Sequence, residues 1–126
     1  MTEIPSGDVT LQTIAMPADA NANGDIFGGW LMAQMDLGAS VLARRRARGR
    51  VATVAVDAMQ FLRPVKVGDI VSIHALMTRE GRSSMGIGIE VWVQHLGAEE
   101  RIKVTEATFT FVAIDDDGNS RPLPKE

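Results

Sequence analysis

The chain has 126 residues, including 13 basic and 16 acidic side chains that give a formal net charge of −3, and it contains no cysteine. This length suits one domain, and the absence of cysteine excludes disulfides, zinc–thiolate sites and thiol nucleophiles. The balanced charge gives no bulk electrostatic reason to bind nucleic acid or an anionic membrane. The first residues lack the basic and apolar regions of a signal peptide, and no run is long enough to span a bilayer, so a cytoplasmic protein is expected.

The first half of the chain predicts one strand, one loop and one long helix. A tail (1–8) and a β-prone run (9–15) end at a proline turn, and a glycine-rich loop (21–29) follows. The loop leads into an apolar segment that is expected to be helical over about 28–48 and to end at Gly49, a residue suited to a left-handed cap. A helix of about twenty residues is roughly 30 Å long, so other elements must cover it.

The second half predicts the covering sheet. The clearest signal lies between Met85 and Val93, where apolar side chains alternate with glycine or polar residues, as in a strand. The predicted strands cover 50–62, 70–78, 85–93 and 103–114. Joined by short turns, they would form an antiparallel meander, with the early strand as a fifth member. The expectation is an α+β fold, a curved sheet wrapped around one helix, forming a single domain over 9–120 with a tail at 121–126. An uncovered sheet edge favours the pairing of two copies.

Asp36 is an unusual residue because the segment around it, 28–43, is otherwise nearly free of charge. Helical spacing surrounds it with mostly small residues, among them Ala33, Ala39 and Ser40, and apolar side chains are expected on the other sides of the helix. An unpaired buried carboxylate is unfavourable, so Asp36 needs hydrogen-bond donors, a partner subunit or a wet cleft that binds a ligand. A structural hydrogen bond or a thin exposed strip would explain it as well.

Several short motifs follow one another along the chain. They are Ala15-Met16-Pro17-Ala18-Asp19, Asn21-Ala22-Asn23-Gly24-Asp25-Ile26-Phe27-Gly28-Gly29-Trp30, Met35-Asp36, Phe61-Leu62-Arg63-Pro64-Val65, Val67-Gly68-Asp69, Arg82-Ser83-Ser84-Met85 and Glu90-Val91-Trp92-Val93. Together these motifs resemble the bacterial YciA-type acyl-CoA thioesterases of the hot-dog superfamily. The resemblance implies the hot-dog fold, hydrolysis of acyl-coenzyme A (acyl-CoA) thioesters, an active site at a dimer interface and commonly a trimer of dimers.

The resemblance also implies roles for residues of the loop and helix. Asp36 matches the family's catalytic acid, acting either as general base on water or as nucleophile. Asn21 matches a loop residue that would face the acid of the other subunit, although a turn would also favour asparagine here. Gly28 and Gly29 can offer backbone N–H groups at the helix start to an oxyanion. Asp25 is a weaker loop candidate that could instead cap the helix.

Candidates for binding the coenzyme lie further along. Arg82, Ser83 and Ser84 match a stretch that in the family lies beside the nucleotide and phosphates, although a polar hairpin tip would look the same. Arg63 and the basic run 44–50 are reserve candidates for a phosphate, and the run would also complement the helix dipole. No metal and no separate cofactor are expected, because coenzyme A is part of the substrate.

Two other functions compete with hydrolysis. An enoyl-CoA hydratase of the same fold would place a histidine and an acid in the active-site region, and this loop contains no histidine. A non-catalytic acyl-CoA binding or sensing module would be expected to carry an output segment such as a helix-turn-helix, and none is apparent. Release of free thiol and hydration of an enoyl-CoA distinguish these possibilities.

Overall fold

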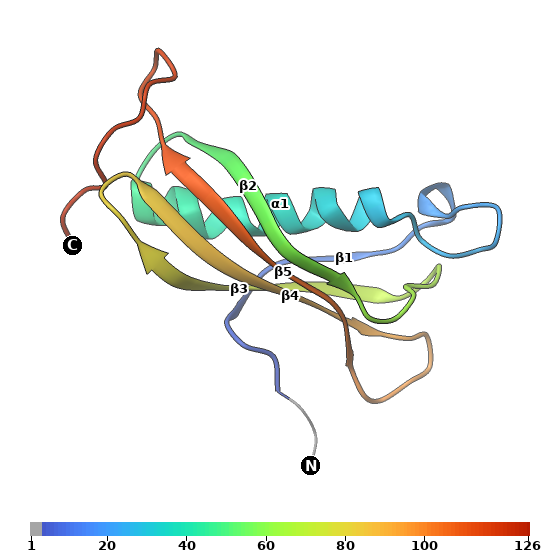
Figure 1. Ribbon diagram of the computed structural model, residues 1–126. Helices are drawn as coiled ribbons and strands as arrows, with labels where there is room; N and C mark the ends of the chain where they lie inside the picture. Colours follow the sequence, from blue (N-terminus) through green and yellow to red (C-terminus); the bar gives the residue numbers. More distant parts are fainter. Residues whose placement is uncertain (1–3) are drawn as a thin grey trace.

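The computed structural model describes residues 4–126, so the first three residues of the predicted N-terminal tail lie outside the described residues. One long helix lies against a curved sheet, with a short 3₁₀ turn before it (Figure 1). The elements are β1 (Asp8–Ile14), η1 (Pro17–Asp19), α1 (Gly28–Ala47), β2 (Val51–Phe61), β3 (Ile70–Glu80), β4 (Ser84–Gln94) and β5 (Ile102–Ala113). The predicted curved sheet of five antiparallel strands around one helix is confirmed.

The strand order differs from the expected meander. The sheet runs β1-β3-β4-β5-β2, so only β3, β4 and β5 form a meander, while β2 pairs with β5 at the far edge. The link between β2 and β3 carries the chain across the sheet. Within it, Val65 O accepts a hydrogen bond from Ile26 N at 3.0 Å, and Gly68 N donates to Ala15 O at 2.8 Å. These bonds bring the start of β3 beside β1, which therefore takes the place expected for β2.

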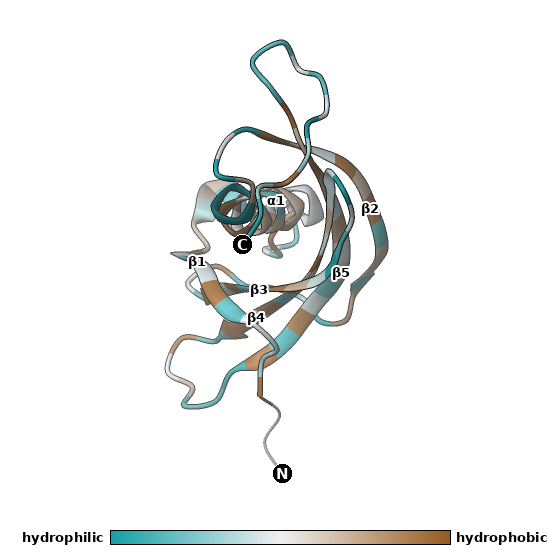
Figure 2. Ribbon diagram, turned by 90° about the vertical axis from the view of Figure 1, so that its left-hand side faces the viewer, coloured by the Kyte–Doolittle hydropathy of each residue, from teal (hydrophilic) through white to brown (hydrophobic). Residues whose placement is uncertain are grey.

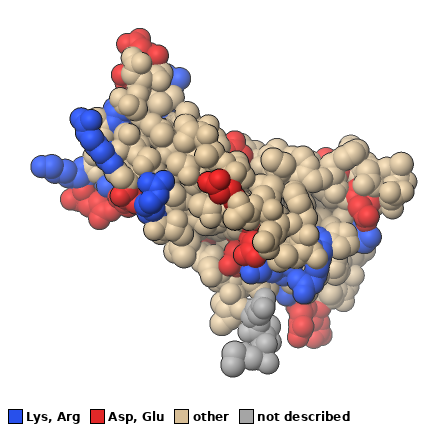
Figure 3. All heavy atoms as spheres, viewed as in Figure 1, with Lys and Arg blue, Asp and Glu red and all other residues tan. Residues whose placement is uncertain are grey.

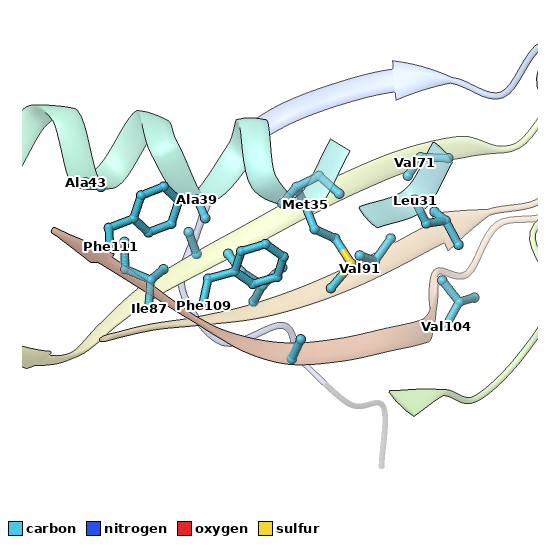
Figure 4. Packing of buried hydrophobic residues seen from close by; sticks show 14 of the residues in the cluster. Leu31, Met35, Ala39, Ala43, Val71, Ile87, Val91, Val104, Phe109 and Phe111 are labelled. Atoms are coloured by element: carbon cyan, nitrogen blue, oxygen red, sulfur yellow. The ribbon is translucent and has the colours of Figure 1, made fainter. Parts of the chain in front are cut away.

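The core lies between α1 and the concave face of the sheet. The end-on view in Figure 2 shows the sheet curling around the helix. Leu31, Met35, Ala39, Ala43 and Ala47 recur every four residues along α1 and are buried, so they form its inner stripe. Figure 4 shows the first four of them above the sheet. The sheet contributes the inward-facing residues of its central strands, including the predicted pair Phe109 and Phe111.

Small residues let the helix approach the sheet closely. A Cβ atom added at Gly38 would lie 2.5 Å from Ile73 Cγ2, so a larger side chain there would force the two elements apart. At the helix end the left-handed residue is Arg48, with φ 54°, and the predicted cap at Gly49 is wrong. Gly49 makes room for another contact, because the Arg121 guanidinium passes close to it and donates from Nη2 to Ala47 O at 2.9 Å.

The opposite side of α1 is uncovered in the single chain. Met32 and Leu37 are 41% and 54% exposed, so the expectation that apolar contacts surround the helix is wrong for one chain alone. The sheet covers one side only, and the edge strand β2 beside this open face is itself exposed. No helix within residues 4–126 has enough continuous apolar sequence to cross a membrane.

Candidate active site

Asp36 lies in the middle of α1, opposite the beginning of β2. Thr53 on β2 donates a hydrogen bond from Oγ1 to Asp36 Oδ1 at 2.5 Å. The Asp36 side chain is half-buried, and within residues 4–126 no ion pair neutralises its charge. The carboxylate is therefore held in one orientation by a neutral hydroxyl and stays open on its other side.

A cavity of about 280 Å³ opens beside this carboxylate. One wall is α1, with Asp36, Ser40 and Arg44, and the other is the start of β2 with the segment just before it. Its lining is Asp36, Ser40, Arg44, Arg50, Val51, Thr53 and Phe111. The Ser40 hydroxyl donates to Leu37 O at 2.7 Å, so its oxygen retains acceptor capacity toward the cavity.

A second hollow, of about 320 Å³, lies at the beginning of α1 against the end of β2. Gly28, Phe61 and Arg63 are among its lining residues. Both Gly28 and Gly29 are exposed in the first turn of α1, where backbone N–H groups have no acceptor within the helix. The positive end of the helix dipole adds to their attraction for an anion. In chemical terms this end of the helix can stabilise an oxyanion.

Asn21 shapes the loop that precedes α1. Its side-chain oxygen accepts hydrogen bonds from Asn23 N at 2.9 Å and Asp25 N at 3.1 Å. This is the turn geometry that asparagine favours. The bonds occupy the carbonyl oxygen and leave the two amide N–H donors of Asn21 free of them. Asn21 does not line the cavity of Asp36 within one chain.

Asp25 does not cap the helix, so that expectation is wrong. The residue at the helix N-cap is Phe27, and no side chain caps the helix there. Asp25 instead pairs with Lys66 Nζ, and the two residues also form a backbone β-bridge. The Asp25 carboxylate and the Lys66 ammonium come together because the link after β2 passes directly beside the loop. These contacts tie the loop to that link, and Asp25 also lines the hollow beside Gly28.

Arg82, Ser83 and Ser84 form the hairpin between β3 and β4. The exposed Arg82 accepts a hydrogen bond at its carbonyl oxygen from Leu123 N at 2.8 Å, and Ser84 Oγ accepts one from Arg79 Nη1 at 3.2 Å. The hairpin lies at the end of α1, whereas Gly28 and Gly29 lie at its beginning (Figure 1). An α-helix of 20 residues separates them by roughly 30 Å. One chain therefore does not bring these two predicted groups together.

The basic run 44–50 divides into side chains with different surroundings. Arg46 Nε lies 2.9 Å from Glu80 Oε1 in an ion pair, and Arg48 is the residue whose left-handed backbone conformation ends the helix. Arg44 and Arg50 line the cavity of Asp36. Figure 3 shows Lys and Arg atoms at this end of the molecule beside Asp and Glu atoms, and a second basic group on the lower side of the other half. The reserve candidate Arg63 lies elsewhere, in the hollow at the start of α1.

Two contacts have no signal in the sequence. The Thr53–Asp36 bond joins residues from two elements whose register only the folded chain defines. His95 meets the almost fully buried Asp69, with 2.8 Å between His95 Nδ1 and Asp69 Oδ1, in a separate cavity of about 380 Å³. Asp69 Oδ2 also accepts a hydrogen bond from Lys66 N at 2.9 Å, so both carboxylate oxygens of this buried acid have polar partners. Within residues 4–126, no group of three His, Asp or Glu side chains is placed to hold a metal ion.

Comparison with known proteins adds the family context. A family model described as "Thioesterase superfamily" matches residues 23–99. The acyl-CoA thioester hydrolase YciA of Salmonella typhimurium is 55% identical over 98% of this chain and 96% of its own length. A hexameric thioesterase of Yersinia pestis has a TM-score of 0.94 at 54% identity, covering 98% of this chain and all of the other. An acyl-CoA hydrolase of Staphylococcus aureus, solved with butyryl coenzyme A and coenzyme A, is 32% identical with a TM-score of 0.84, over 90% of this chain and 70% of the other.

Proposed function

The chain belongs to the thioesterase superfamily and is an acyl-CoA thioester hydrolase, and we propose that Asp36 is its catalytic acid. The single observation that carries this proposal is the setting of Asp36, a half-buried carboxylate held by Thr53 at the rim of a polar cavity. An oriented carboxylate with one open side can accept a proton from water or attack a carbonyl carbon itself. Asp36 is the one carboxylate among the residues that line this cavity.

In the general-base route, Asp36 takes a proton from water while the water oxygen bonds to the thioester carbonyl carbon. The tetrahedral oxyanion then collapses, the C–S bond breaks, and the leaving coenzyme thiolate takes up the proton. In the nucleophilic route, Asp36 displaces the thiolate to form an anhydride that water cleaves. Thr53 serves both routes as a positioning residue, because its hydroxyl holds Oδ1 in place. The proposal needs only water as co-reactant, so we expect no metal and no cofactor.

The chain self-associates, and we propose that each active site is shared between two copies. Among residues 4–126, the lining of the Asp36 cavity does not include Gly28, Gly29 or Asn21, so the oxyanion donors and the amide would come from the partner. The exposed β2 and the uncovered face of α1 supply an apolar surface beside Asp36 for that partner. Three such dimers would form a hexamer, the assembly described for the relative from Yersinia pestis and for the acyl-coenzyme A thioesterase HI0827. The proposed location is the cytoplasm.

Mixing two inactive variants tests the shared site. Asp36→Asn and Asn21→Ala should each be nearly inactive as pure proteins. After co-refolding, half of the dimers are mixed, and each mixed dimer contains one intact site if the residues act across the interface, so about a quarter of wild-type activity should return. Thiol release from butyryl-CoA measures it. If the mixture stays as inactive as its components, the two residues do not act across chains; a fully active Asn21→Ala would remove Asn21 from the mechanism.

A further inference from the structure

The cavity beside Asp36 carries opposite charges at its two ends. Asp36, Ser40 and Arg44 are four residues apart, so they follow one stripe of α1 along the cavity. Asp36 and Arg44 are roughly 12 Å apart along the helix axis, and long helical side chains lean toward the N-terminus, which brings the guanidinium back toward the acid. Arg50 enters from the opposite wall. Two arginines, both exposed, therefore line the space next to the proposed catalytic carboxylate.

Arg44 and Arg50 have no carboxylate partner among the residues that the structure describes. Arg50 Nη1 donates only to the backbone carbonyls of Asp115 and Asp116, at 3.2 and 3.0 Å, and these bonds leave its other N–H groups free. Backbone carbonyls satisfy donors without neutralising the charge. A ligand with charged oxygens would supply what the chain itself does not.

The helix dipole does not explain which arginine of α1 lines the cavity. Arg44, Arg45 and Arg46 all lie in the last turns of α1, where any cation is favoured. Arg46 pairs with Glu80, and Arg45, which is exposed like Arg44, does not line the cavity. Only Arg44 joins Arg50 in lining it. The dipole favours all three arginines alike, and the helix face that Arg44 shares with Asp36 is what places it in the cavity with Arg50.

We propose that Arg44 and Arg50 form an anion subsite for the thioester substrate. The inference rests on the proposed function, and it adds a determinant of substrate choice to it. Planar guanidinium groups bind carboxylate or phosphate oxygens in pairs. The anion is either a carboxylate at the far end of a short acyl chain or a phosphate of coenzyme A. The hairpin with Arg82 lies at the same end of the molecule, in keeping with a phosphate arriving from that side (Figure 1).

Arg44→Gln tests the subsite, with Arg45→Gln as its matched control. Both replacements remove one charge from the same end of α1, and both keep a good helix former. Four thioesters separate the sources of the anion: butyryl-CoA, glutaryl-CoA, and the butyryl and glutaryl esters of pantetheine, which has no phosphate. Because Arg50 also holds backbone carbonyls, Arg50→Lys is the second variant, and circular dichroism and sedimentation check that each protein is folded and assembled.

A charge-assisted contact predicts a rise of roughly tenfold in KM for Arg44→Gln and none for Arg45→Gln. If the anion is a phosphate, both coenzyme A esters lose affinity and both pantetheine esters do not. If it is the acyl carboxylate, both glutaryl esters lose affinity and both butyryl esters do not. Either pattern supports the subsite. No change with any ester, or an equal change with all four including butyryl-pantetheine, overturns it.

Calorimetric titration separates this inference from the proposed function. Wild-type chain and Arg44→Gln are titrated with free coenzyme A and with glutarate, so the readout needs no turnover. Binding of one of the two should weaken by about tenfold in the variant. If the wild-type chain hydrolyses none of the thioesters, the proposed function fails, while the titration still supports or overturns the subsite. Equal binding of both probes to the two proteins overturns the subsite even in an active hydrolase.

Discussion

The strands β2 and β4 have the same length and a similar apolar character, yet their surroundings are opposite. Seven of the eleven residues of β4 are buried, and none of the eleven in β2 is. β4 lies at the centre of the sheet, with its inward residues packed against α1, whereas β2 lies at an edge. The β4 side of the core is complete within one chain. The β2 side is not, and this is where Asp36 and its cavity lie.

The closed core and the proposed catalytic site therefore occupy different parts of the sheet. The inward residues of β4 are apolar and pack against the inner stripe of α1. β2 contributes Thr53 to the cavity and presents the exposed Val54 and Val56 next to it. A surface that is both apolar and adjacent to unpaired charges is suited to a second copy that closes the site. Substitutions on the two strands should therefore have separable effects.

The largest effect is expected for Asp36→Asn. The amide keeps the size of the side chain but cannot act as base or nucleophile, so kcat should fall by at least about a hundredfold while folding, assembly and coenzyme A binding persist. Thiol release from acyl-CoA measures it. Asp69→Asn is the contrasting control, because that buried acid should matter for the melting temperature and not for activity per folded molecule. Near wild-type turnover by folded Asp36→Asn would falsify the proposed mechanism.

Val54→Lys tests the open side of the sheet. Val54 is 57% exposed in the single chain, so its replacement should leave the fold of one chain intact. A lysine in an apolar contact between copies is unfavourable, and we expect smaller assemblies in sedimentation with activity falling in parallel. Ala98→Lys adds the same charge on an exposed loop and should change neither. A fully active monomer would contradict both the role of β2 and the shared site.

Ile87→Val tests the closed side of the sheet. Ile87 is fully buried on β4, and removing one methylene there should lower the free energy of unfolding by about 0.5–1.5 kcal/mol. Chemical denaturation measures this change. Assembly and kcat per folded molecule should stay as in the wild type, because the residue faces the core within one chain. Loss of assembly without loss of stability would show that the two sides are not separable.

The smallest effect is expected for Arg82→Ala. An exposed contact to a phosphate mostly contributes binding that the ground state and the transition state share, so KM should rise a few-fold with little change in kcat. The pantetheine ester of the same acyl group should show no change. Arg101→Ala removes an exposed arginine from the loop between β4 and β5 and serves as control. Equal losses with both esters would speak against a phosphate contact at the hairpin.

The sequence by itself determined the helix and the strands, and it showed Asp36 as an isolated charge in an apolar helix. The alternation over β4 and the long apolar run of α1 are local patterns, because the side-chain periods of strands and helices are properties of the backbone itself. The same holds for the inward placement of Phe109 and Phe111. The family motifs indicate Asp36, Asn21 and the hairpin at Arg82 as candidate site residues. They do not indicate how these residues are arranged in space.

Only the tertiary structure decided the strand order, the surroundings of Asp36 and the grouping of charges. β2 lies beside β5 because the link after it crosses the sheet, and this brings Thr53 to Asp36 across 17 residues of sequence. The same packing pairs Arg46 with Glu80 and places Arg44 and Arg50 in the lining of one cavity. No local pattern encodes these choices, since each depends on which elements become neighbours and in which register, and that is set by the packing of the whole chain.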